Sequence, residues 1–381
     1  LHPVVIDNVR RLRAISGMDE ISFHMSGTEA VMQAVRLARY HTRRRYAVRF
    51  CGAYHGWWGD VQPGTGNPLI ARDTLTLHDM SESALRVLQH RQDIACVLVN
   101  PLQGLHPNRG APADSALIAA RGSYSFDREA YAAWLQRLRQ ICDQRGIALI
   151  LDEVFLGFRL APGGAQEYFG VKADLVTYGK TVAGGLPIGL VAGRSRWMRR
   201  FNPDRPGDIC FARGTFNSHP YVMGAMNEFL RALETEPLRA LYRDLDQKWS
   251  GRAEFLNQQL MKTGAPVRVA NLSTVWALYF TQPSRYHWML QYYLRAQGLA
   301  LSWVGSGRLI FTLNCTDAEF SEVVQRVEAA ARAMHSDGWW WIDPTVNARS
   351  MQRRVLREML QARCSSVFSL VIGSISSPRS K

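Results

Sequence analysis

Lysine is scarce in this chain of 381 residues, although the chain carries a formal charge of +14. Lysine stands only at positions 172, 180, 248, 262 and 381, so arginine supplies nearly all of the positive charge. The arginines are scattered, and no zinc finger, aromatic RNA motif or sustained basic helix accompanies them, which argues against nucleic-acid binding. A lysine that stands inside a motif is therefore informative in this sequence.

The chain also lacks paired cysteines and long apolar runs. Its six cysteines lie far apart and form no CxxC pair, so the sequence predicts neither a disulfide framework nor a metal site. A reducing, cytoplasmic setting fits this pattern. No signal peptide is visible, and no apolar run approaches the roughly 20 residues that a membrane-spanning helix needs. We expect no membrane association. The start at Leu1, without a methionine, suggests an excised segment or a domain of a longer polypeptide.

Short apolar runs alternate with helical patterns in the first part of the chain. The apolar runs cover 46–50, 94–100, 147–152, 174–177 and 189–192, and the helical patterns cover 28–44, 127–145 and 219–235. Strands separated by helices in this way predict an α/β fold, with a mostly parallel sheet covered on both faces. Ligands of such sheets gather beyond the carboxyl ends of the strands.

The pattern changes after about residue 245. A long helix, strand-like runs at 274–280 and 308–313, and a helix from 317 to about 334 predict a smaller α+β domain. We therefore expect a large domain over 1–245, a smaller domain over 246–338, and a tail or linker over 339–381.

Two residues at predicted strand ends carry the main chemical signal. Asp152 ends the run ALILD, and a buried carboxylate must find a cationic or hydrogen-bonding partner. Lys180 follows the run DLVTYG and precedes a glycine-rich loop. Each residue alone has an ordinary explanation, as a turn aspartate or a solvated lysine. Together they match the needs of pyridoxal 5′-phosphate (PLP), whose aldehyde forms a Schiff base with a lysine and whose pyridine nitrogen pairs with a carboxylate.

A third signal is the tetrapeptide Ser26-Gly27-Thr28-Glu29 at the start of a predicted helix. The free backbone N–H groups and positive end of such a helix suit a phosphate. An ordinary serine cap with an acidic first turn is the simpler interpretation of this motif taken alone.

With these motifs in order, the sequence resembles the class III, fold-type I PLP-dependent aminotransferases, particularly the branch that contains glutamate-1-semialdehyde aminomutase. The segments that carry the resemblance are SGTEAVMQAVRLAR, GAYHGWWGD, LILDEVFLGFRLAPGGAQEYFGVKADLVTYGKTVAGGLPIG and GTFNSHP. They cover roughly residues 1 to 235, with weaker similarity through the smaller domain.

The resemblance implies a role for each matching residue. Lys180 would bond to the cofactor and move protons, and Asp152 would hold the pyridine nitrogen. Tyr54 would stack on the ring, with Val154 on its other side. The remaining cofactor-binding residues would be Ser26, Gly27 and Thr28 at the phosphate, His55 beside Tyr54, and Gln103 at the ring hydroxyl.

The resemblance also implies an obligate homodimer, in which Thr215 of one subunit reaches the phosphate bound by the other. An amino acid would serve as amino donor. Many family members carry Glu-Pro where this chain has Asn100-Pro101, and no arginine of the smaller domain can be assigned from the sequence to a substrate carboxylate. An uncharged acyl group needs no such cation.

In these departures the chain resembles the aminotransferase domains of polyketide and nonribosomal peptide assembly lines. The sequence variants that carry this resemblance are NPLQG, HGWWGD and DGWWW. The expected acceptor is then a β-keto acyl chain on an acidic acyl carrier protein, which the basic surface would attract. A free-standing glutamate-1-semialdehyde 2,1-aminomutase, with isomerase activity, is the alternative. A catalytically silent scaffold or docking domain is the alternative of another class.

Overall fold

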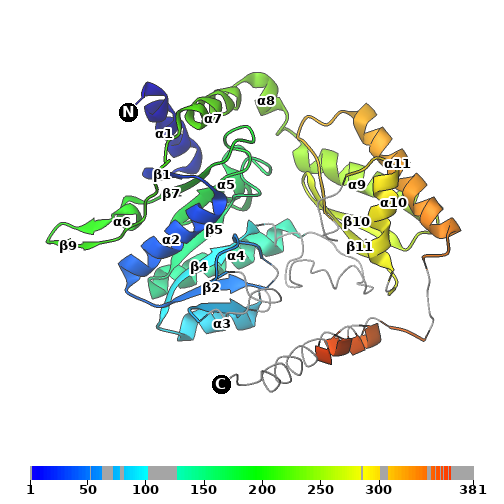
Figure 1. Cartoon of the computed structure of the whole chain (residues 1–381), viewed down its shortest axis with the longest axis horizontal. Helices are drawn as coiled ribbons and strands as arrows, with labels where there is room; N and C mark the ends of the chain where they lie inside the picture. Colours follow the sequence, from blue (N-terminus) through cyan, green and yellow to red (C-terminus); the bar gives the residue numbers. More distant parts are fainter. Residues whose placement is uncertain are drawn as a thin grey trace, which may run out of the picture.

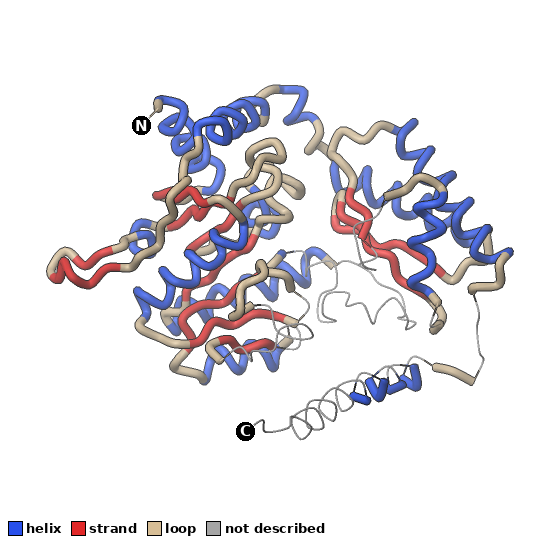
Figure 2. The backbone as a smooth tube through the Cα atoms, viewed as in Figure 1, coloured by secondary structure: helices blue, strands red, loops and turns tan. Residues whose placement is uncertain are grey.

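Two groups of elements make up the computed structural model, one around a seven-stranded sheet and one around a three-stranded sheet (Figures 1 and 2). The structure describes residues 2–51, 53–61, 72–77, 81–101, 127–284, 286–300, 308–340, 345–347, 349–351, 353–354, 356–358 and 360–361. A two-stranded hairpin of β8 (Phe201–Asn202) and β9 (Arg205–Ile209) extends from the first group.

The large sheet has the strand order β1-β7-β6-β5-β4-β2-β3. Its strands are β1 (Glu20–His24), β2 (Tyr46–Phe50), β3 (Thr74–Leu77), β4 (Ile94–Val99), β5 (Ala148–Asp152), β6 (Leu175–Tyr178) and β7 (Gly189–Gly193). The strand β7 pairs antiparallel with both of its neighbours, and the other pairs are parallel. The predicted α/β fold with a mostly parallel sheet is confirmed.

Side chains of the large sheet alternate between two apolar layers. In β5, Leu149 and Leu151 pack into one core, and Ala148 and Ile150 pack into the other. Every residue of β4, β5 and β6 is buried, as expected for parallel strands covered on both faces.

Helices cover both faces of this sheet (Figure 1). One core takes residues of α1 (Pro3–Ser16), α3 (Glu82–His90), α4 (Arg128–Arg145), α5 (Gly164–Phe169) and α7 (Pro220–Ala232). The opposite core takes residues of α2 (Gly27–Thr42) and α6 (Ser195–Met198). The short helix α8 (Glu236–Ala240) leads to the second group.

The second group of elements has its own core. It comprises α9 (Leu245–Lys262), β10 (Val267–Leu272), β11 (Val275–Phe280), the 3-10 helix η3 (His287–Met289), α10 (Leu290–Ala296), β12 (Arg308–Ile310) and α11 (Asp317–Ser336). Its strands are antiparallel in the order β10-β11-β12, and Trp249 and Trp276 are fully buried beneath them. Trp340 joins this core and donates its indole N–H to the Ala331 carbonyl at 2.9 Å. Among the described helices, none combines the length and apolar character that crossing a membrane requires.

One edge of the large sheet gathers the residues singled out in the sequence. Asn100, Asp152 and Lys180 lie at or just beyond the carboxyl ends of the parallel strands β4, β5 and β6. Because β7 runs the other way, its first residue, Gly189, lies at the same edge. The backbone of Gly189 passes so close to Ser26 that a Cβ atom there would stand 1.9 Å from the Ser26 carbonyl oxygen.

We expect Gly189→Ala to lower the free energy of unfolding by at least about 2 kcal/mol, because the added methyl group forces the backbones at Gly189 and Ser26 apart. Urea unfolding measures the change. Gly207→Ala on β9 is the matched control, since a Cβ at Gly207 meets nothing within 4 Å. Equal losses in the two variants would contradict the close approach as the cause.

Candidate functional site

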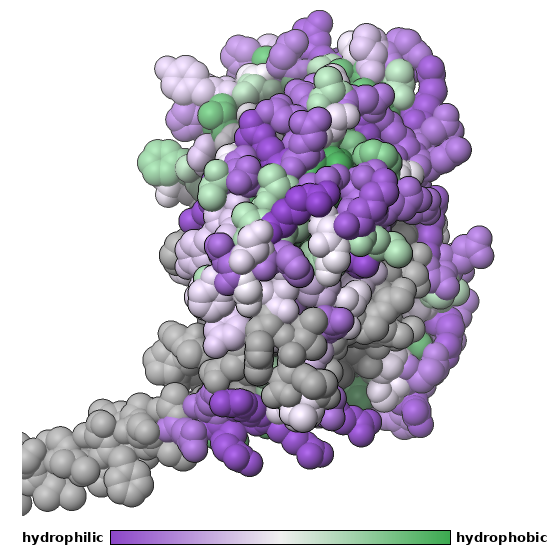
Figure 3. All heavy atoms as spheres, turned by 90° about the vertical axis from the view of Figure 1, so that its right-hand side faces the viewer, coloured by the Kyte–Doolittle hydropathy of each residue, from purple (hydrophilic) through white to green (hydrophobic). Residues whose placement is uncertain are grey.

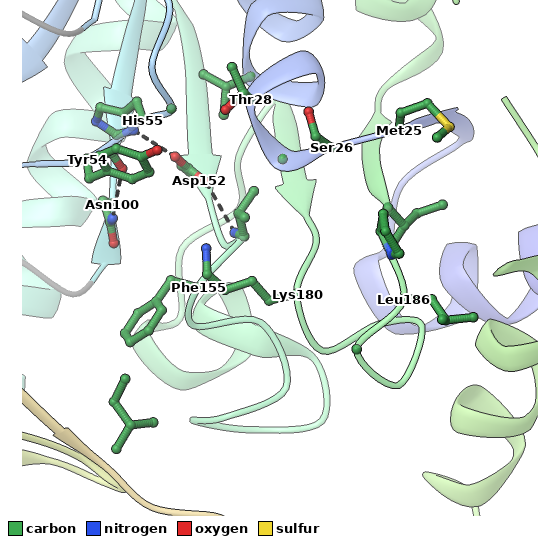
Figure 4. Close-up of a pocket in the computed structure, with 18 of the residues that line it drawn as sticks. Met25, Ser26, Thr28, Tyr54, His55, Asn100, Asp152, Phe155, Lys180 and Leu186 are labelled. Carbon is green, nitrogen blue, oxygen red and sulfur yellow. Dashed lines mark hydrogen bonds and ion pairs between the residues drawn. The ribbon is translucent and has the colours of Figure 1, made fainter. Parts of the chain in front are cut away.

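A cavity of about 620 Å³ opens at this edge of the large sheet (Figure 4). Segments that follow β1, β2, β4, β5 and β6 contribute to it, as does the segment before β7 and the strand β12 of the second group. Its lining residues are Met25, Ser26, Gly27, Thr28, Val31, Tyr54, His55, Gly56, Asn100, Asp152, Val154, Phe155, Lys180, Gly185, Leu186, Pro187, Ile188, Arg308 and Ile310.

Asp152 is a buried carboxylate whose two oxygens both have partners. His55 Nδ1 lies 2.8 Å from Oδ2, while the Thr177 hydroxyl and the Val154 amide donate to Oδ1 at 3.1 and 3.2 Å. His55 is itself buried. These bonds fix the orientation of the carboxylate and offset the cost of burying it.

Lys180 enters the same cavity from the next strand. It lies two residues beyond the end of β6, and its φ of +29° is unusual for a residue that carries a side chain. Its amine lies 5.9 Å from the centre of the Phe155 ring. In Figure 4 the side chains of Lys180 and Asp152 point into one common space. Strained backbone at a lysine beside a buried carboxylate is typical of functional sites.

The first turn of α2 forms another wall of the cavity. The Ser26 hydroxyl caps the helix by accepting from the Glu29 amide at 3.2 Å, and the Glu29 carboxylate accepts from the Met25 amide at 2.8 Å. The amides of Gly27 and Thr28 have no partner within the helix because the first turn leaves them free. They are suited to bind an anion.

Glycines allow this turn to approach the strand ends closely. A Cβ at Gly27 would stand 2.4 Å from Val154 Cγ1, and one at Gly56, where φ is +96°, would stand 2.6 Å from Thr28 Oγ1. The Gly56 backbone therefore packs against the start of α2. Tyr54, two residues earlier, is half-exposed and lines the cavity. Asn100 supports Tyr54 by donating to its carbonyl at 3.3 Å.

Arg308 is a charged lining residue that the sequence did not reveal. It comes from β12 of the second group, and its Nε is buried without a hydrogen-bond partner among the described residues. Burial lowers the pKa of the Arg308 guanidinium. A largely buried guanidinium whose Nε has no partner among the described residues is suited to an anionic ligand. No local motif marks this arginine; only the placement of β12 brings it to the cavity.

The structure brings together most of the residues assigned from the sequence. Those in the lining are Ser26, Gly27, Thr28, Tyr54, His55, Asp152, Val154 and Lys180. Thr215 is exposed and does not line the cavity of its own chain, whereas Gln103 lies outside the described residues. The roles of all these residues toward a cofactor stay predictions.

A family model for class III aminotransferases matches residues 125–331, which is more than half of the chain. This chain belongs to the class III aminotransferase family. The matched stretch contains Asp152, Lys180 and Arg308, which are charged residues of the cavity wall.

Two curated relatives of this class III aminotransferase family member are named glutamate-1-semialdehyde 2,1-aminomutase. The one from Methanococcus maripaludis strain C7 is 34% identical over 276 residues, and the one from Methanothermobacter thermautotrophicus is 38% identical over 279 residues. The alignments cover 68% of this chain in both cases, and 58% and 59% of the relatives. The chain thus spans less than two thirds of the length of these relatives.

A solved structure described as a transaminase with PLP bound is also similar to this chain. The two superpose with a TM-score of 0.72 at 27% sequence identity, over 88% of this chain and 79% of the other. The superposed part must include both groups of elements, because the first group ends near Ala240 and makes up less than 88% of the chain.

The residues of the cavity fit PLP as a set of donors and acceptors. A buried carboxylate suits a protonated ring nitrogen, a lysine amine suits an aldehyde, and free amides at a helix start suit a phosphate. All three features line one cavity.

Proposed function

We propose that this chain binds PLP in the cavity at the sheet edge and transfers amino groups. The observation that carries the proposal is the convergence of Lys180 and Asp152, from the ends of adjacent strands, on one cavity next to the start of α2. Bound PLP supplies an electron sink for bond-breaking next to an amine. The membership of the class III family supports this proposal.

Each polar group of the cavity has a task in this reaction. Asp152 would accept a hydrogen bond from the ring nitrogen and favour its protonated form, while His55 and Thr177 keep Asp152 in place. The Lys180 amine would hold the cofactor and, once released, would serve as the base and acid of the proton transfer. The amides of Gly27 and Thr28 would bind the phosphate.

We expect Lys180→Ala to abolish the absorption band at the edge of the visible range and to prevent borohydride from fixing the cofactor to the chain, because no other lysine lines the described cavity. Lys172→Ala, at an exposed position outside the cavity, is the matched control and keeps both properties. Retention of borohydride-fixed cofactor by Lys180→Ala would refute the assignment. A folded wild-type protein that takes up no PLP would favour the silent scaffold.

We further infer that the substrate carries a free carboxylate. Arg308 faces the cavity as a cation without a counter-charge among the described residues, and a carboxylate is its natural bidentate partner. The curated relatives named glutamate-1-semialdehyde 2,1-aminomutase support the aminomutase alternative better than a carrier-bound acyl acceptor.

The carrier-bound β-keto acyl acceptor, and with it an acyl carrier protein as partner, stays a prediction from sequence. One of its grounds was that no arginine could be assigned to a substrate carboxylate, and Arg308 in the cavity lining removes that ground. Two assays distinguish the substrates. Turnover of glutamate 1-semialdehyde without an added amino donor supports the aminomutase, and amination of a β-keto thioester in the presence of an amino donor supports the carrier-bound acceptor.

We expect Arg308→Gln to lower kcat/KM for carboxylate-bearing substrates by about 10- to 100-fold, because a hydrogen-bonded charge pair contributes about 1.5–3 kcal/mol. Uncharged amines and thioesters should lose little. Arg295→Gln, on the exposed side of α10, is the control. Steady-state kinetics with matched charged and uncharged substrates measures the difference; an equal loss on both substrates would contradict a carboxylate contact.

We also propose that the chain acts as a homodimer. Large apolar side chains are exposed along one segment of the first group, at Phe201, Ile209, Phe211, Phe216 and Tyr221. Thr215 is exposed in the same segment. In Figure 1 the β8–β9 hairpin lies at the end of the molecule opposite the second group, whose outer face is mostly hydrophilic in Figure 3. An apolar, exposed segment of this kind suits contact between subunits.

A mixed dimer tests whether Thr215 completes the partner's site. In a dimer of one Lys180→Ala subunit and one Thr215→Ala subunit, only one site keeps its lysine, and that site receives the intact threonine across the interface. We expect it to bind PLP with wild-type affinity, whereas the Thr215→Ala homodimer binds about 2- to 10-fold more weakly through the loss of one hydrogen bond. Weak binding by the mixed dimer would place the contact within one chain. Equilibrium dialysis measures both affinities.

A further inference from the structure

Glu153 is a buried acid to which neither the sequence nor the proposed reaction gives a task. It follows Asp152 directly, and its side chain is fully buried. A carboxyl group at such a position requires compensation for its lost hydration. Unlike Asp152, it points away from the cavity, whose lining includes its neighbours on both sides but not Glu153 itself.

The contacts of Glu153 join three separate parts of the fold. Its amide donates to the Thr177 carbonyl at 2.9 Å, and its carbonyl accepts from the Gly157 amide at 2.7 Å. Its Oε2 accepts from the Ala165 amide, in the first turn of α5, at 2.7 Å. The side chain therefore closes the loop between β5 and α5, while the backbone fixes that loop to β6.

The fit around this carboxyl group is close. At Gly164, where φ is +72°, a Cβ would stand 2.2 Å from Glu153 Oε2. The second oxygen, Oε1, and the Tyr178 hydroxyl are both buried without a hydrogen-bond partner among the described residues. Glycine at 164 is thus required both by its backbone conformation and by the space that the carboxyl group fills.

We propose that Glu153, as a neutral carboxylic acid, is a positioning residue that fastens the segment Asp152–Phe155 to the first turn of α5. This segment carries the ring-nitrogen partner Asp152 and the cavity-lining residues Val154 and Phe155. For its effect on turnover the inference rests on the proposed function; for its effect on structure and stability it does not.

The electrostatic surroundings keep the proton on Glu153. Burial raises its pKa to about 8, against the ordinary value of 4.5, and the adjacent charge of Asp152 adds to the rise. Hydrogen bonds from the Ala165 and Gln166 amides act in the opposite direction but do not outweigh burial. Tyr178 on β6 is the other titratable group that faces it, and burial raises the pKa of this phenol as well. No cation among the described residues counters these effects.

The sign of the pH dependence follows from this shift. Between about pH 4.5 and 8 the unfolded chain has released the proton of Glu153, whereas the folded chain still holds it. Wild-type stability therefore falls as pH rises through this window. Glu153→Gln keeps an acceptor for the Ala165 amide and has no proton to lose.

We expect the unfolding midpoint of Glu153→Gln, relative to wild type, to rise progressively from pH 5 to pH 8 and to level off above. Urea unfolding at a series of pH values measures this difference, with or without cofactor. A difference that stays constant with pH would overturn the neutral state of Glu153.

Hydrogen exchange measured by mass spectrometry tests the fastening itself. We expect the peptide that contains Ala165 to lose protection in Glu153→Ala and to keep it in Glu153→Gln, with a peptide from α9 unchanged in both. Gly164→Ala should cause the same loss, because its Cβ would displace the Glu153 carboxyl group. Unchanged protection in Glu153→Ala would overturn the positioning role, whether or not the chain binds PLP.

Turnover provides the third measurement. With PLP bound, Glu153→Ala should lower kcat on the order of a hundredfold, the effect of a misplaced reacting group, and Glu153→Gln should restore most of it at pH 7. In wild type, kcat should fall above about pH 8, and Glu153→Gln should lack this alkaline loss. If kcat falls above pH 8 in both wild type and Glu153→Gln, the loss belongs to the titration of another group. If all variants lack PLP while exchange and stability behave as expected, the proposed function fails and the positioning role stands.

Discussion

The buried carboxylate of Asp152 is the constraint around which the cavity is arranged. It ends the central strand β5, and three hydrogen bonds from neighbouring segments keep it there. Two of these donors, His55 and Thr177, come from the segment after β2 and from β6. A charged group without water needs such partners, so the segments that carry them are fixed with it. These fixed segments form the part of the cavity wall that lies next to Lys180.

Two acids lie next to one another at this strand end, and their side chains have different surroundings. Asp152 faces the cavity with a histidine and a hydroxyl as partners, whereas Glu153 turns into the core and holds its proton. Alternation of side chains at the end of a strand produces this division. One carboxyl group is thereby available to a ligand, and the other serves the fold.

The sequence predicted the parts of this protein that local patterns determine. The buried strands β4, β5 and β6 are largely apolar runs, Asp152 ends one of them and Lys180 lies two residues beyond another, so strand ends and chemistry could be located together. The start of α2 was equally visible, because a capping serine followed by an acidic first turn is a local signal.

Features that depend on tertiary packing were not predicted. Arg308 stands in a three-residue strand of the second group, and nothing near it in sequence indicates that the strand faces the cavity. The hairpin of β8 and β9 is short and mostly exposed, so it lacks the buried apolar run that marks the central strands of the first group. The burial of Glu153 is concealed as well, since an acid after a strand usually faces solvent.

The position of Arg308 has a consequence for how the molecule selects ligands. The guanidinium belongs to the second group of elements and the Lys180 amine to the first, and Leu272 and Val275 of the second group pack into a core of the first. The distance between them is therefore set by the packing of β10 and β11 into that core. A ligand that contacts both Arg308 and Lys180 must therefore have a length that matches this distance.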